Sequence, residues 1–430
     1  MMGEIINIRL LTTPSSTSLL GVPGKINVFL REYNQQMKQE NYPMVAKTLH
    51  GFEEICAQEL RQLGASKVEL GIRSVRFEGD LGFMYKANLN LRTAIKIVKP
   101  IAQFTLKNQD DLSRKMDEID WSQYIEVDQS FAIDTTLNSE IFTHSLFVSQ
   151  KAKDAIVDQF RKKTGRRPDV DLQFPDLRLN IHIQQNQCTV SLDSSGKSLH
   201  QRGYRTATNI APINEVLAAG ILLLSGWKGQ TPFLDPMCGS GTFLVEAAMI
   251  ACNIPANINR KEFAFEKWAD FDEVLWEKII EVSLKRTREY PFKLVGYDKA
   301  PSAVHKAIDN VANAHLSEFI EVRQANFFTS EKEVSGPLHL VFNPPYGERL
   351  DIEMESFYKS IGDTLKKGYP QTDAWMITSN LEALKHVGLR PTAKIKLFNS
   401  HLESRLVHYP MYSGSKRTKF QIHEGQSTDL

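Results

Sequence analysis

The stretch Leu234-Asp235-Pro236-Met237-Cys238-Gly239-Ser240-Gly241-Thr242 decides the fold of this chain. It follows a short apolar strand and opens an apolar helical run. Two glycines two residues apart allow a sharp backbone turn and the close approach of a ligand. The free N–H groups at the start of the next helix suit an anionic or carboxylate ligand. The stretch therefore predicts a strand, a ligand-binding turn and a helix, although a purely structural junction would have the same pattern.

The residues after this turn disfavour a plain dinucleotide-binding fold. That fold reads G-x-G-x-x-G, with an acid about 20 residues later. Here the third glycine is missing, and the next acid at a strand end, Asp298 in Val295-Gly296-Tyr297-Asp298-Lys299, lies 57 residues beyond Gly241. An acid at the end of a second strand can accept hydrogen bonds from both hydroxyls of a ribose. An Asp in this position can also be a helix cap or a solvated residue.

The chain leaves its predicted sheet abruptly at Asn343-Pro344-Pro345-Tyr346, directly after the apolar run Leu338–Phe342. Two prolines cannot continue a central strand, and their rigidity fixes the Asn343 amide and a backbone carbonyl beside a pocket. Two such acceptors suit the two N–H groups of an exocyclic base amine, guanine N2 or adenine N6. The Tyr346 ring offers a face for stacking on a base, worth about 1–3 kcal/mol. These four residues are the predicted catalytic group, with an ordinary proline-rich turn as the alternative.

Strands and helices alternate from Ala211 onward, as a mostly parallel, doubly wound α/β sheet requires. Closing this part of the chain, Lys394–Phe398 and Arg405–Tyr409 predict an antiparallel hairpin. Buried strands are predicted at Phe233–Leu234, Leu294–Tyr297, Leu338–Phe342 and Ala374–Thr378, with helices near residues 242–252, 301–315, 355–367 and 380–387.

Two smaller α+β units precede this domain. Residues 44–101 include the predicted helix Gly51–Leu63 and a helix from Leu81 that Asp80 caps. Residues 102–205 include the long helix His144–Lys163 and two alternating strands that form a hairpin. The polar segment 1–43 is predicted to be a disordered extension upstream of the natural start, with Met37 as a candidate initiator, and residues 413–430 a flexible tail.

Composition excludes several classes of protein. The chain has 430 residues with 52 Lys+Arg against 51 Asp+Glu, so a polyanionic partner must be held by a local patch. Its four cysteines show no C-x-x-C spacing, which argues against a zinc site or a disulfide framework and favours a reducing, cytoplasmic location. The longest apolar run, Val216–Trp227, is well short of the ~20 residues of a membrane span. No secretory signal is recognisable at the N-terminus.

With these motifs in order, the sequence resembles class I S-adenosylmethionine-dependent methyltransferases. The residues of these motifs are similar to those of the RlmL-like RNA guanine-N2 methyltransferases, which carry an N-terminal THUMP domain. The resemblance covers about residues 44–412 and includes His200-Gln201-Arg202-Gly203-Tyr204-Arg205, Ala211-Pro212-Ile213-Asn214-Glu215 and Phe77-Glu78-Gly79-Asp80. It implies a Rossmann-like methyltransferase domain at 206–412, preceded by a ferredoxin-like unit at 44–101 and a THUMP RNA-binding domain at 102–205.

The resemblance also implies a cofactor site for S-adenosyl-L-methionine. Asp235, Gly239 and Gly241 would line its methionine side, and Asp298 would bind its ribose. Asn326 stands where the family commonly has Asp for the adenine amine, so the charge is lost but the acceptor is kept. The full expected set is Asp235, Pro236, Gly239, Gly241, Thr242, Asp298, Lys299, Asn326 and Phe327. The family's fused second methyltransferase half is absent here, so one modification is expected instead of two.

RNA binding needs a local basic patch, and residues 151–205 contain 11 Lys+Arg and 6 Asp+Glu. The densest part is at the end of the predicted helix, where it would grip phosphate and RNA shape, although a basic helix C-terminus also complements the helix dipole. Tyr204 and Arg205 lie at the junction of the two halves and would touch RNA, the cofactor or only the interdomain packing. The expected RNA-binding residues are Arg161, Lys162, Lys163, Arg166, Arg167, Arg202 and Arg205.

The favoured function is an RNA methyltransferase that modifies guanine N2, with 23S ribosomal RNA ahead of transfer RNA by resemblance only. Cys238 as a nucleophile is disfavoured, because it lies in the cofactor loop, where a small apolar residue simply packs. An adenine-N6 methyltransferase of DNA or RNA and a non-catalytic RNA-binding assembly factor remain as rivals. No metal and no membrane are expected, a monomer is favoured, and the nucleotide modified cannot be named from the sequence.

Overall fold

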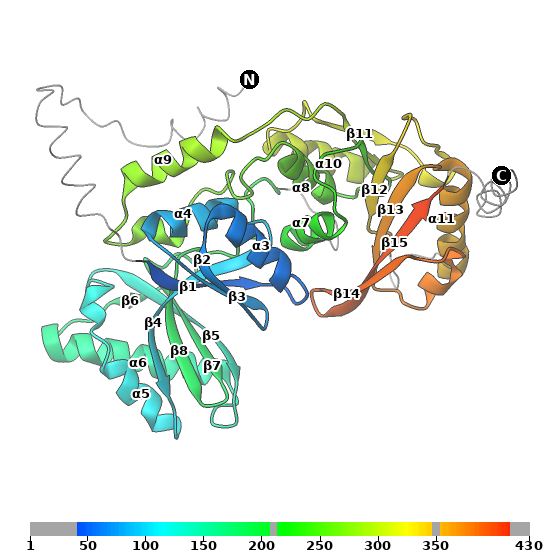
Figure 1. Ribbon diagram of the computed structural model, residues 1–430. Coiled ribbons are helices and arrows are strands. Elements are labelled where there is room, and N and C mark those ends of the chain that lie inside the picture. Colours follow the sequence, from blue (N-terminus) through cyan, green and yellow to red (C-terminus); the bar gives the residue numbers. More distant parts are fainter. Residues whose placement is uncertain (1–40, 207–212, 346–352, 413–430) are drawn as a thin grey trace, which may run out of the picture.

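The computed structural model describes residues 41–206, 213–345 and 353–412. Figure 1 shows two lobes, an N-terminal one built on one sheet and a C-terminal one built on another. The predicted extension at 1–43 lies outside the described residues up to residue 40, and its last two residues already belong to strand β1. The predicted tail at 413–430 also lies outside them.

The N-terminal lobe contains one eight-stranded sheet in the order β2-β3-β1-β4-β8-β7-β5-β6. Strand β4 pairs with β1 near its start and with β8 along its second half, so it joins the two predicted units into one sheet. The predicted boundary between residues 101 and 102 falls inside this strand. The strands are β1 (Tyr42–Thr48), β2 (Ser66–Gly71), β3 (Ser74–Gly79), β4 (Ala94–Thr105), β5 (Ser130–Asn138), β6 (Asp169–Val170), β7 (Leu177–Gln184) and β8 (Gln187–Asp193).

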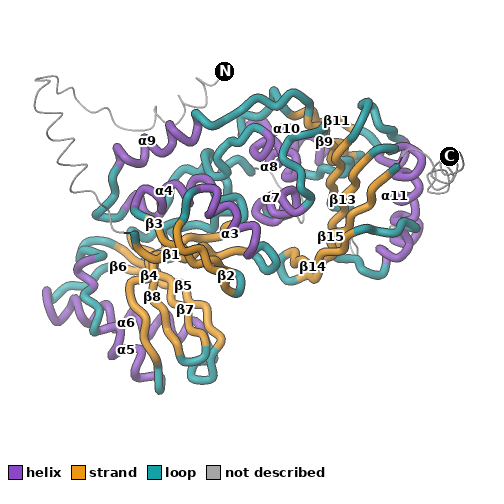
Figure 2. Tube along the Cα trace, viewed as in Figure 1, coloured by secondary structure: helices purple, strands orange, loops and turns teal. Residues whose placement is uncertain are grey.

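Helices pack on this sheet, as Figure 2 shows. The predicted cap is present, because the Asp80 carboxylate accepts the N–H of Phe83 at 2.7 Å. The predicted long helix at 144–163 is α6, which ends at Gly165 in a left-handed turn. The helices are α3 (Glu53–Leu63), α4 (Leu81–Asn90), α5 (Gln109–Asp117), α6 (Ser145–Thr164) and the short 3-10 helix η1 (Trp121–Gln123).

The C-terminal lobe contains a seven-stranded sheet in the order β11-β10-β9-β12-β13-β15-β14. The first five strands are parallel, and β15 pairs antiparallel with both β13 and β14, which confirms the predicted hairpin. The strands are β9 (Phe233–Asp235), β10 (Leu294–Asp298), β11 (Ile320–Gln324), β12 (Leu338–Phe342), β13 (Thr372–Thr378), β14 (Ala393–Asn399) and β15 (Leu402–Met411).

Helices cover both faces of this sheet. In Figure 1, α7, α8 and α10 lie on the side that faces the N-terminal lobe, and α11 lies on the other side. The predicted helix at 380–387 is only a 3-10 helix, η4. The elements are α7 (Glu215–Leu224), α8 (Thr242–Ala251), α9 (Glu273–Leu284), α10 (Pro301–Asn313), α11 (Met354–Gly368), η2 (Ala264–Lys267), η3 (Phe327–Thr329) and η4 (Ala383–Val387).

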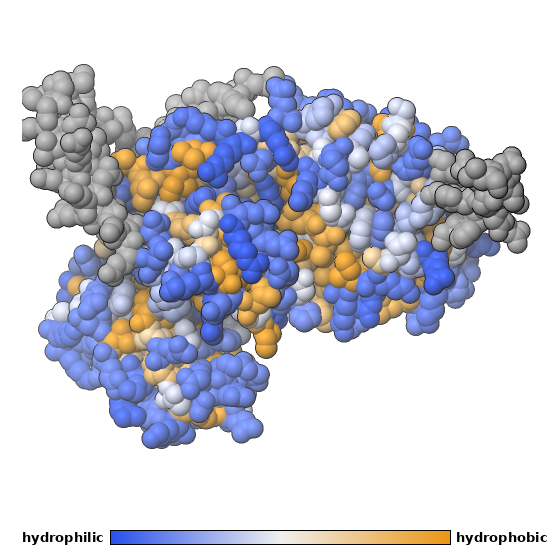
Figure 3. All heavy atoms as spheres, viewed as in Figure 1, coloured by the Kyte–Doolittle hydropathy of each residue, from blue (hydrophilic) through white to orange (hydrophobic). Residues whose placement is uncertain are grey.

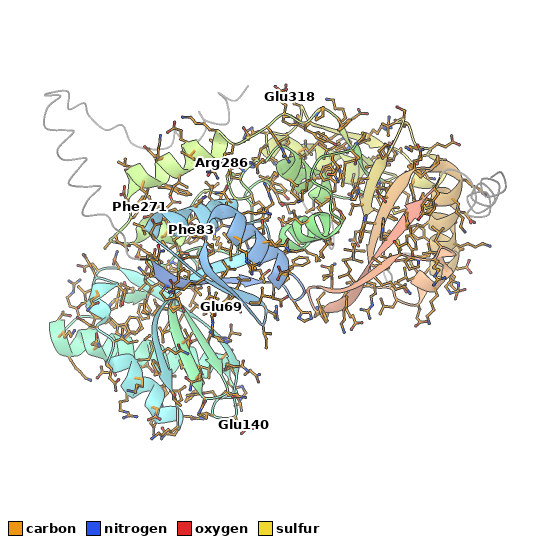
Figure 4. The ribbon with its side chains drawn as sticks, viewed as in Figure 1. Glu69, Phe83, Glu140, Phe271, Arg286 and Glu318 are labelled. Atoms are coloured by element: carbon orange, nitrogen blue, oxygen red, sulfur yellow. The ribbon has the colours of Figure 1, made fainter. Side chains whose placement is uncertain are left out.

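The two lobes share one hydrophobic core. Phe52 from the N-terminal lobe packs on α7 so tightly that a Cβ at Gly220 would lie 2.1 Å from its ring. Helix α4 lies against α9, and Figure 4 shows the labelled Phe83 and Phe271 on this side of the molecule. The Tyr85 ring of α4 stacks on Phe265 at 4.4 Å. The lobes are therefore packed together as one body.

Three buried arginines fasten the connecting segment, residues 194–206, to both lobes. Arg260 donates to the carbonyls of Ser195, Lys197, Ser198 and Gln201 at 2.8 to 3.2 Å. Arg202 donates to the carbonyls of Leu199 and Arg92 and lies 3.3 Å from the Glu246 carboxylate, with both side chains fully buried. Arg92 in turn donates to the carbonyls of Met249 and Ile254.

Candidate active site

The polar residues singled out in the C-terminal lobe meet at one edge of its sheet. Asp235, Asp298 and Asn343 lie at or directly after the carboxyl ends of β9, β10 and β12, and Asn326 lies just beyond β11. The strand order reverses between β9 and β12, and parallel sheets bind their ligands at this kind of switch point. The structure therefore brings together the ends of the four strands that carry the predicted site.

The glycine turn after β9 is held against the end of β10. The Cys238 N–H donates to the Tyr297 carbonyl at 2.8 Å, and the Gly239 N–H donates to the Asp298 carboxylate at 3.0 Å. Gly239 and Gly241 adopt positive φ angles of 55° and 81°, which favour glycine. A Cβ on Gly241 would also lie 3.2 Å from the Cβ of Ala307 on α10. The N–H groups of Cys238, Gly239 and Gly241 are thus bonded within the protein, and the turn is a fixed backbone cradle that a ligand can approach closely.

Two carboxylates flank this turn in different environments. Asp298 is half-buried and accepts the N–H groups of Gly239 and Ala300, one on each oxygen. Each carboxylate oxygen keeps further acceptor capacity, so this group can also bind hydroxyls. Asp235 is fully buried and accepts only the Met237 N–H, at 3.2 Å, among the described residues. Burial, with the nearby Asp298 charge, raises the pKa of Asp235 well above its ordinary range.

Cys238 is a packing residue. Its side chain is 6% exposed, and its sulfur lies 3.3 Å from where a Cβ on Gly296 would stand. Burial and the neighbouring Asp235 and Asp298 carboxylates raise the pKa of the thiol, so the thiolate that a nucleophile requires is disfavoured. This environment fits the predicted packing role and opposes the nucleophile alternative.

The remaining predicted cofactor residues lie in unlike environments. Pro236 is buried beneath the turn, and Lys299 is exposed beyond β10. Asn326 is exposed and caps η3 by accepting the Phe328 N–H at 3.1 Å. Phe327 is 2% exposed and packs on Phe342 and Tyr369 in the core under α11. The Phe327 ring therefore serves the core, and only its backbone can face a ligand.

Asn343 carries the most telling feature of the site. Its side-chain oxygen Oδ1 is buried, and no hydrogen-bond partner for it exists in the described part of the chain. A buried amide oxygen without a partner costs about 1–3 kcal/mol, so a native protein normally keeps one only for a ligand or water. Pro344 is buried and Pro345 half-buried beside it. Tyr346 lies outside the described residues.

Two arginines predicted to contact RNA are placed inside the molecule. Arg202 is 1% exposed and pairs with Glu246, so its prediction as an RNA contact is wrong, because its charge is consumed by buried carbonyls and a carboxylate. Arg205 is mostly buried and donates to Thr242 Oγ1 at 2.7 Å and to the Ile213 carbonyl at 3.0 Å. Its Nε lies 3.3 Å from the Glu215 carboxylate. Arg205 thus holds the first residue of α8, next to the glycine turn.

The predicted basic patch at the end of α6 is exposed, but most of its charge is matched. Lys163 lies 2.8 Å from Asp120, Lys162 3.6 Å from Asp117 and Arg161 3.4 Å from Asp158. Arg166 pairs with Asp128. Of the five predicted cations, only Arg167 has no ion pair within the described residues. The local field of this patch is therefore much weaker than its sequence suggests.

A glycine turn after the first strand, an acid after the second and Asn-Pro-Pro after the fourth define the class of this domain, a Rossmann-like methyltransferase domain. Residues 202–408 match the family described as RMKL-like, methyltransferase domain. Residues 107–193 match the THUMP domain, and residues 43–98 match the RlmL ferredoxin-like domain. The chain belongs to the RMKL-like methyltransferase family, and the predicted order of ferredoxin-like, THUMP and methyltransferase parts is confirmed.

Curated relatives agree with this assignment. A Synechocystis sp. protein named "Putative RNA methyltransferase slr0064" is 37% identical over 86% of this chain and 97% of its own length. The ribosomal RNA large subunit methyltransferase K/L of Syntrophotalea carbinolica is 36% identical over 84% of this chain and 52% of its own length. The chain thus spans nearly all of the first relative and about half of the second.

Solved structures give the same fold. The crystal structure of "SMU.472, a putative methyltransferase complexed with SAH" is 29% identical, with a TM-score of 0.77 over 88% of this chain and 100% of that one. A "predicted N6-adenine-specific DNA methylase" from Listeria monocytogenes is 30% identical, with a TM-score of 0.78 over 88% of this chain and 98% of that one.

The described residues contain neither a cluster of metal ligands nor a membrane-spanning helix. Nowhere in residues 41–206, 213–345 and 353–412 do three or more His, Cys, Asp or Glu side chains gather as a metal site requires. In the same ranges no helix is both long enough and apolar enough to cross a bilayer. The expectation that the reaction uses no metal remains a prediction.

Proposed function

We propose that this protein transfers a methyl group from S-adenosyl-L-methionine to the exocyclic N2 of a guanine in RNA, with large-subunit ribosomal RNA as the favoured substrate. The observation that carries the proposal is the buried Oδ1 of Asn343 at the switch point of the sheet, which has no hydrogen-bond partner among the residues that the structure describes. A base amine supplies the hydrogen-bond donor that this oxygen lacks.

The chemistry follows from the electronic state of the amine. The lone pair of an exocyclic base amine is delocalised into the ring, so the nitrogen is a poor nucleophile. Two acceptors, Asn343 Oδ1 and the Pro344 carbonyl, would bind its two N–H groups and favour a pyramidal nitrogen. The rigid Asn-Pro-Pro backbone holds both acceptors in place before the base arrives, which removes an entropic cost from the reaction. Tyr346 is proposed to stack on the base.

The residues around the glycine turn fit the cofactor. Asp298 keeps acceptor capacity for the hydroxyls of a ribose, and the cradle of Gly239 and Gly241 leaves room for close approach. Asp235, Pro236 and Thr242 complete the turn, and Lys299 and Asn326 border it at the ends of β10 and β11. When bound, the cofactor supplies an electrophilic methyl group on a sulfonium.

RNA as the substrate is supported by the domain order. The THUMP match and the names of the relatives both concern RNA. The base would be splayed out of its helix, because pairing and stacking otherwise occupy its amine. A monomeric protein and a cytoplasmic location remain predictions.

Adenine N6 is the second candidate target, because the same two acceptors suit either amine. The name of the Listeria monocytogenes neighbour favours it, whereas the THUMP domain favours RNA over DNA. The two methylated amines are chemically distinguishable, so the identity of the product decides between them.

The test combines one variant with a product analysis. Asn343→Ala should keep S-adenosylmethionine affinity, measured by calorimetry, and lose methyl transfer by about 100-fold or more, in the range of a lost transition-state hydrogen bond. Nucleosides from 23S ribosomal RNA treated with the wild-type protein should contain new N2-methylguanosine by mass spectrometry. Unchanged turnover in the variant would contradict the mechanism. N6-methyladenosine as the sole product would mean that the target is adenine N6.

A further inference from the structure

The register of the N-terminal sheet places a set of polar residues on one face. Lys47 of β1 pairs in register with Lys96 of β4, and Arg76 of β3 lies opposite Val45, two residues from Lys47. On the far side of the sheet, His182 of β7 lies opposite Thr189 of β8. Paired residues point to the same face of a sheet. Following these pairs across β4 and β8, Arg76, Lys47, Lys96 and His182 all point the same way.

The opposite face is the one that packs on the helices. The alternating residues Met44 and Ala46 of β1 and Leu179 and Ile181 of β7 are fully buried in the hydrophobic core. Arg76 and His182, in contrast, are exposed. We call the polar side the open face of the N-terminal sheet.

The open face is concave. Lys47 Nζ lies 2.6 Å from Asn180 Oδ1, although β1 and β7 are separated by β4 and β8. Three strand spacings amount to ~14 Å in a flat sheet, at about 4.8 Å each. The Lys47 and Asn180 side chains both rise out of the sheet and cannot together span that distance, so the sheet must curve toward this face. The result is a trough whose two sides are joined by the Lys47–Asn180 hydrogen bond.

Some cations of the trough are neutralised and some are not. Lys96 bonds Asp134 and Asp193, and Arg178 bonds Asp134 at 3.2 Å. Lys47 instead donates to the neutral Asn180 amide. Within the described residues, no carboxylate lies in ion-pair range of Lys47, Arg76 or His182. Glu69 stands opposite Arg76 in the register of β2 and β3 but makes no ion pair with it there.

Lys47, Arg76 and His182 also interact electrostatically with one another. Although His182 is exposed overall, partial burial of its ring lowers its pKa, and the positive charges of Lys47 and Arg76 lower it further. The lowered pKa keeps His182 uncharged near neutral pH, where its ring can still donate a hydrogen bond, so Lys47 and Arg76 carry the positive charge of this group. The Asp193 and Asp134 carboxylates act on Lys47 only from beyond ion-pair distance, so a phosphate oxygen could still bind its ammonium group directly. The end of α6 is the opposite case, because Asp117, Asp120, Asp128 and Asp158 already pair its cations.

We propose that the open face of the N-terminal sheet binds the RNA phosphate backbone, with Lys47, Arg76 and His182 as its contact group, and that the end of α6 contributes less. This rests on the proposed function, since it assumes an RNA substrate. A phosphate oxygen would replace Asn180 as the acceptor of Lys47, and Arg76 would form the outer contact. Such contacts position RNA without reading its sequence.

The test measures binding of protein-free 23S ribosomal RNA by the full-length protein in filter-binding assays. Lys47→Met with Arg76→Gln should weaken binding about tenfold and lower the slope of log affinity against log salt by about 1–2, since each phosphate contact contributes about 0.7–0.9. Affinity for S-adenosylmethionine and the midpoint of thermal unfolding should not change. Arg76→Gln alone, at an exposed position, should give the same direction without any risk to folding.

Matched controls come from the same sheet and from α6. Glu69 of β2, labelled in Figure 4, lies opposite Arg76 in the sheet. Glu69→Gln removes this negative charge and should tighten binding two- to threefold. Arg161→Gln with Lys162→Gln, on α6, should weaken binding less than the sheet variants. Equal affinity of the sheet variants and the wild type, or a larger loss in the α6 variant, would overturn the proposed face. Absence of RNA binding by the wild-type protein would refute the proposed function itself.

Discussion

Cys238 distinguishes direct methyl transfer from a covalent mechanism through a cysteine thiol. Its thiol is buried and its pKa is raised, and it fills the space beside Gly296. Cys238→Ala should therefore leave turnover within about twofold and cost about 1 kcal/mol of stability, as for a small buried apolar group. Methyl transfer assays and denaturant unfolding check both values. Loss of all turnover would instead support a covalent mechanism through the thiol.

Glu215 predicts a pH dependence of stability. Burial raises its pKa to about 7 in the folded state, from an ordinary value of 4.5. Between these values the folded chain binds more protons than the unfolded one, so this group's contribution to stability falls as pH rises through 7. At about 1.4 kcal/mol per pKa unit, the full loss is on the order of 3.5 kcal/mol, of which about 2–3 kcal/mol falls between pH 5 and 8. The free energy of unfolding of Glu215→Gln should decline less than that of the wild type between pH 5 and 8.

Some residues of the site could be predicted from the sequence and others could not. Asp235, Asp298 and Asn343 follow apolar runs, so their place at the carboxyl edge of a parallel sheet needs only the strand pattern. Arg202 was misassigned, because a sequence does not reveal that oxygen atoms from three separate segments surround its charge. The direction of the Phe327 ring could not be predicted for a related reason, since a ring beside a ligand loop can also turn into the core.

At the scale of elements, Arg205 connects the segment between the lobes to the start of α8. Its hydrogen bond to Thr242 Oγ1 fixes the turn that cradles the cofactor. A hydrogen bond to a charged group is worth about 1.5–3 kcal/mol, so Arg205→Ala should raise the KM for S-adenosylmethionine about tenfold or more. The kcat should stay within about threefold, and Arg205→Lys should recover part of the loss. An equal loss in kcat would indicate a general structural defect.

Several of the elements that the sequence patterns do not predict share a physical cause. Strand β11 is an edge strand with charged residues, and β2 is largely exposed, so neither shows a buried apolar run. Helix α5 is short and strongly polar, with Leu112 and Met116 among its few buried residues. The central strands β9, β10 and β12 were found because burial on both faces demands continuous apolar residues.

At the scale of the whole molecule, the lobes should unfold together. Arg202 and Glu246 are fully buried at their junction, and removal of one partner leaves a buried charge. Arg202→Ala should therefore cost about 3–5 kcal/mol in denaturant unfolding, and Arg202→Met with Glu246→Met should recover much of it. Calorimetry of the wild type should show one transition. Two well-separated transitions would mean that the shared core does not couple the lobes.

The surface of the molecule is mostly polar. Figure 3 shows hydrophilic residues over most of the visible face, with several separate groups of hydrophobic residues among them. Leu70 and Ile72, at the hairpin of β2 and β3, are exposed. The Arg202 and Glu246 side chains that join the lobes are fully buried and contribute nothing to this surface. The near balance of 52 basic and 51 acidic residues therefore describes neither the junction nor the open face.

Gly203 shows how narrowly the joint between the lobes is specified. It lies next to Arg202 at a φ of 100°, and a Cβ there would stand 2.1 Å from the Asn259 carbonyl oxygen. Every amino acid other than glycine carries a Cβ, so every missense change in this codon, whatever base is altered, meets the same obstacle. In a population of cells carrying all single codon changes, this position should tolerate only synonymous ones. The packing of one carbonyl oxygen against Gly203 therefore restricts this codon to the glycine codons.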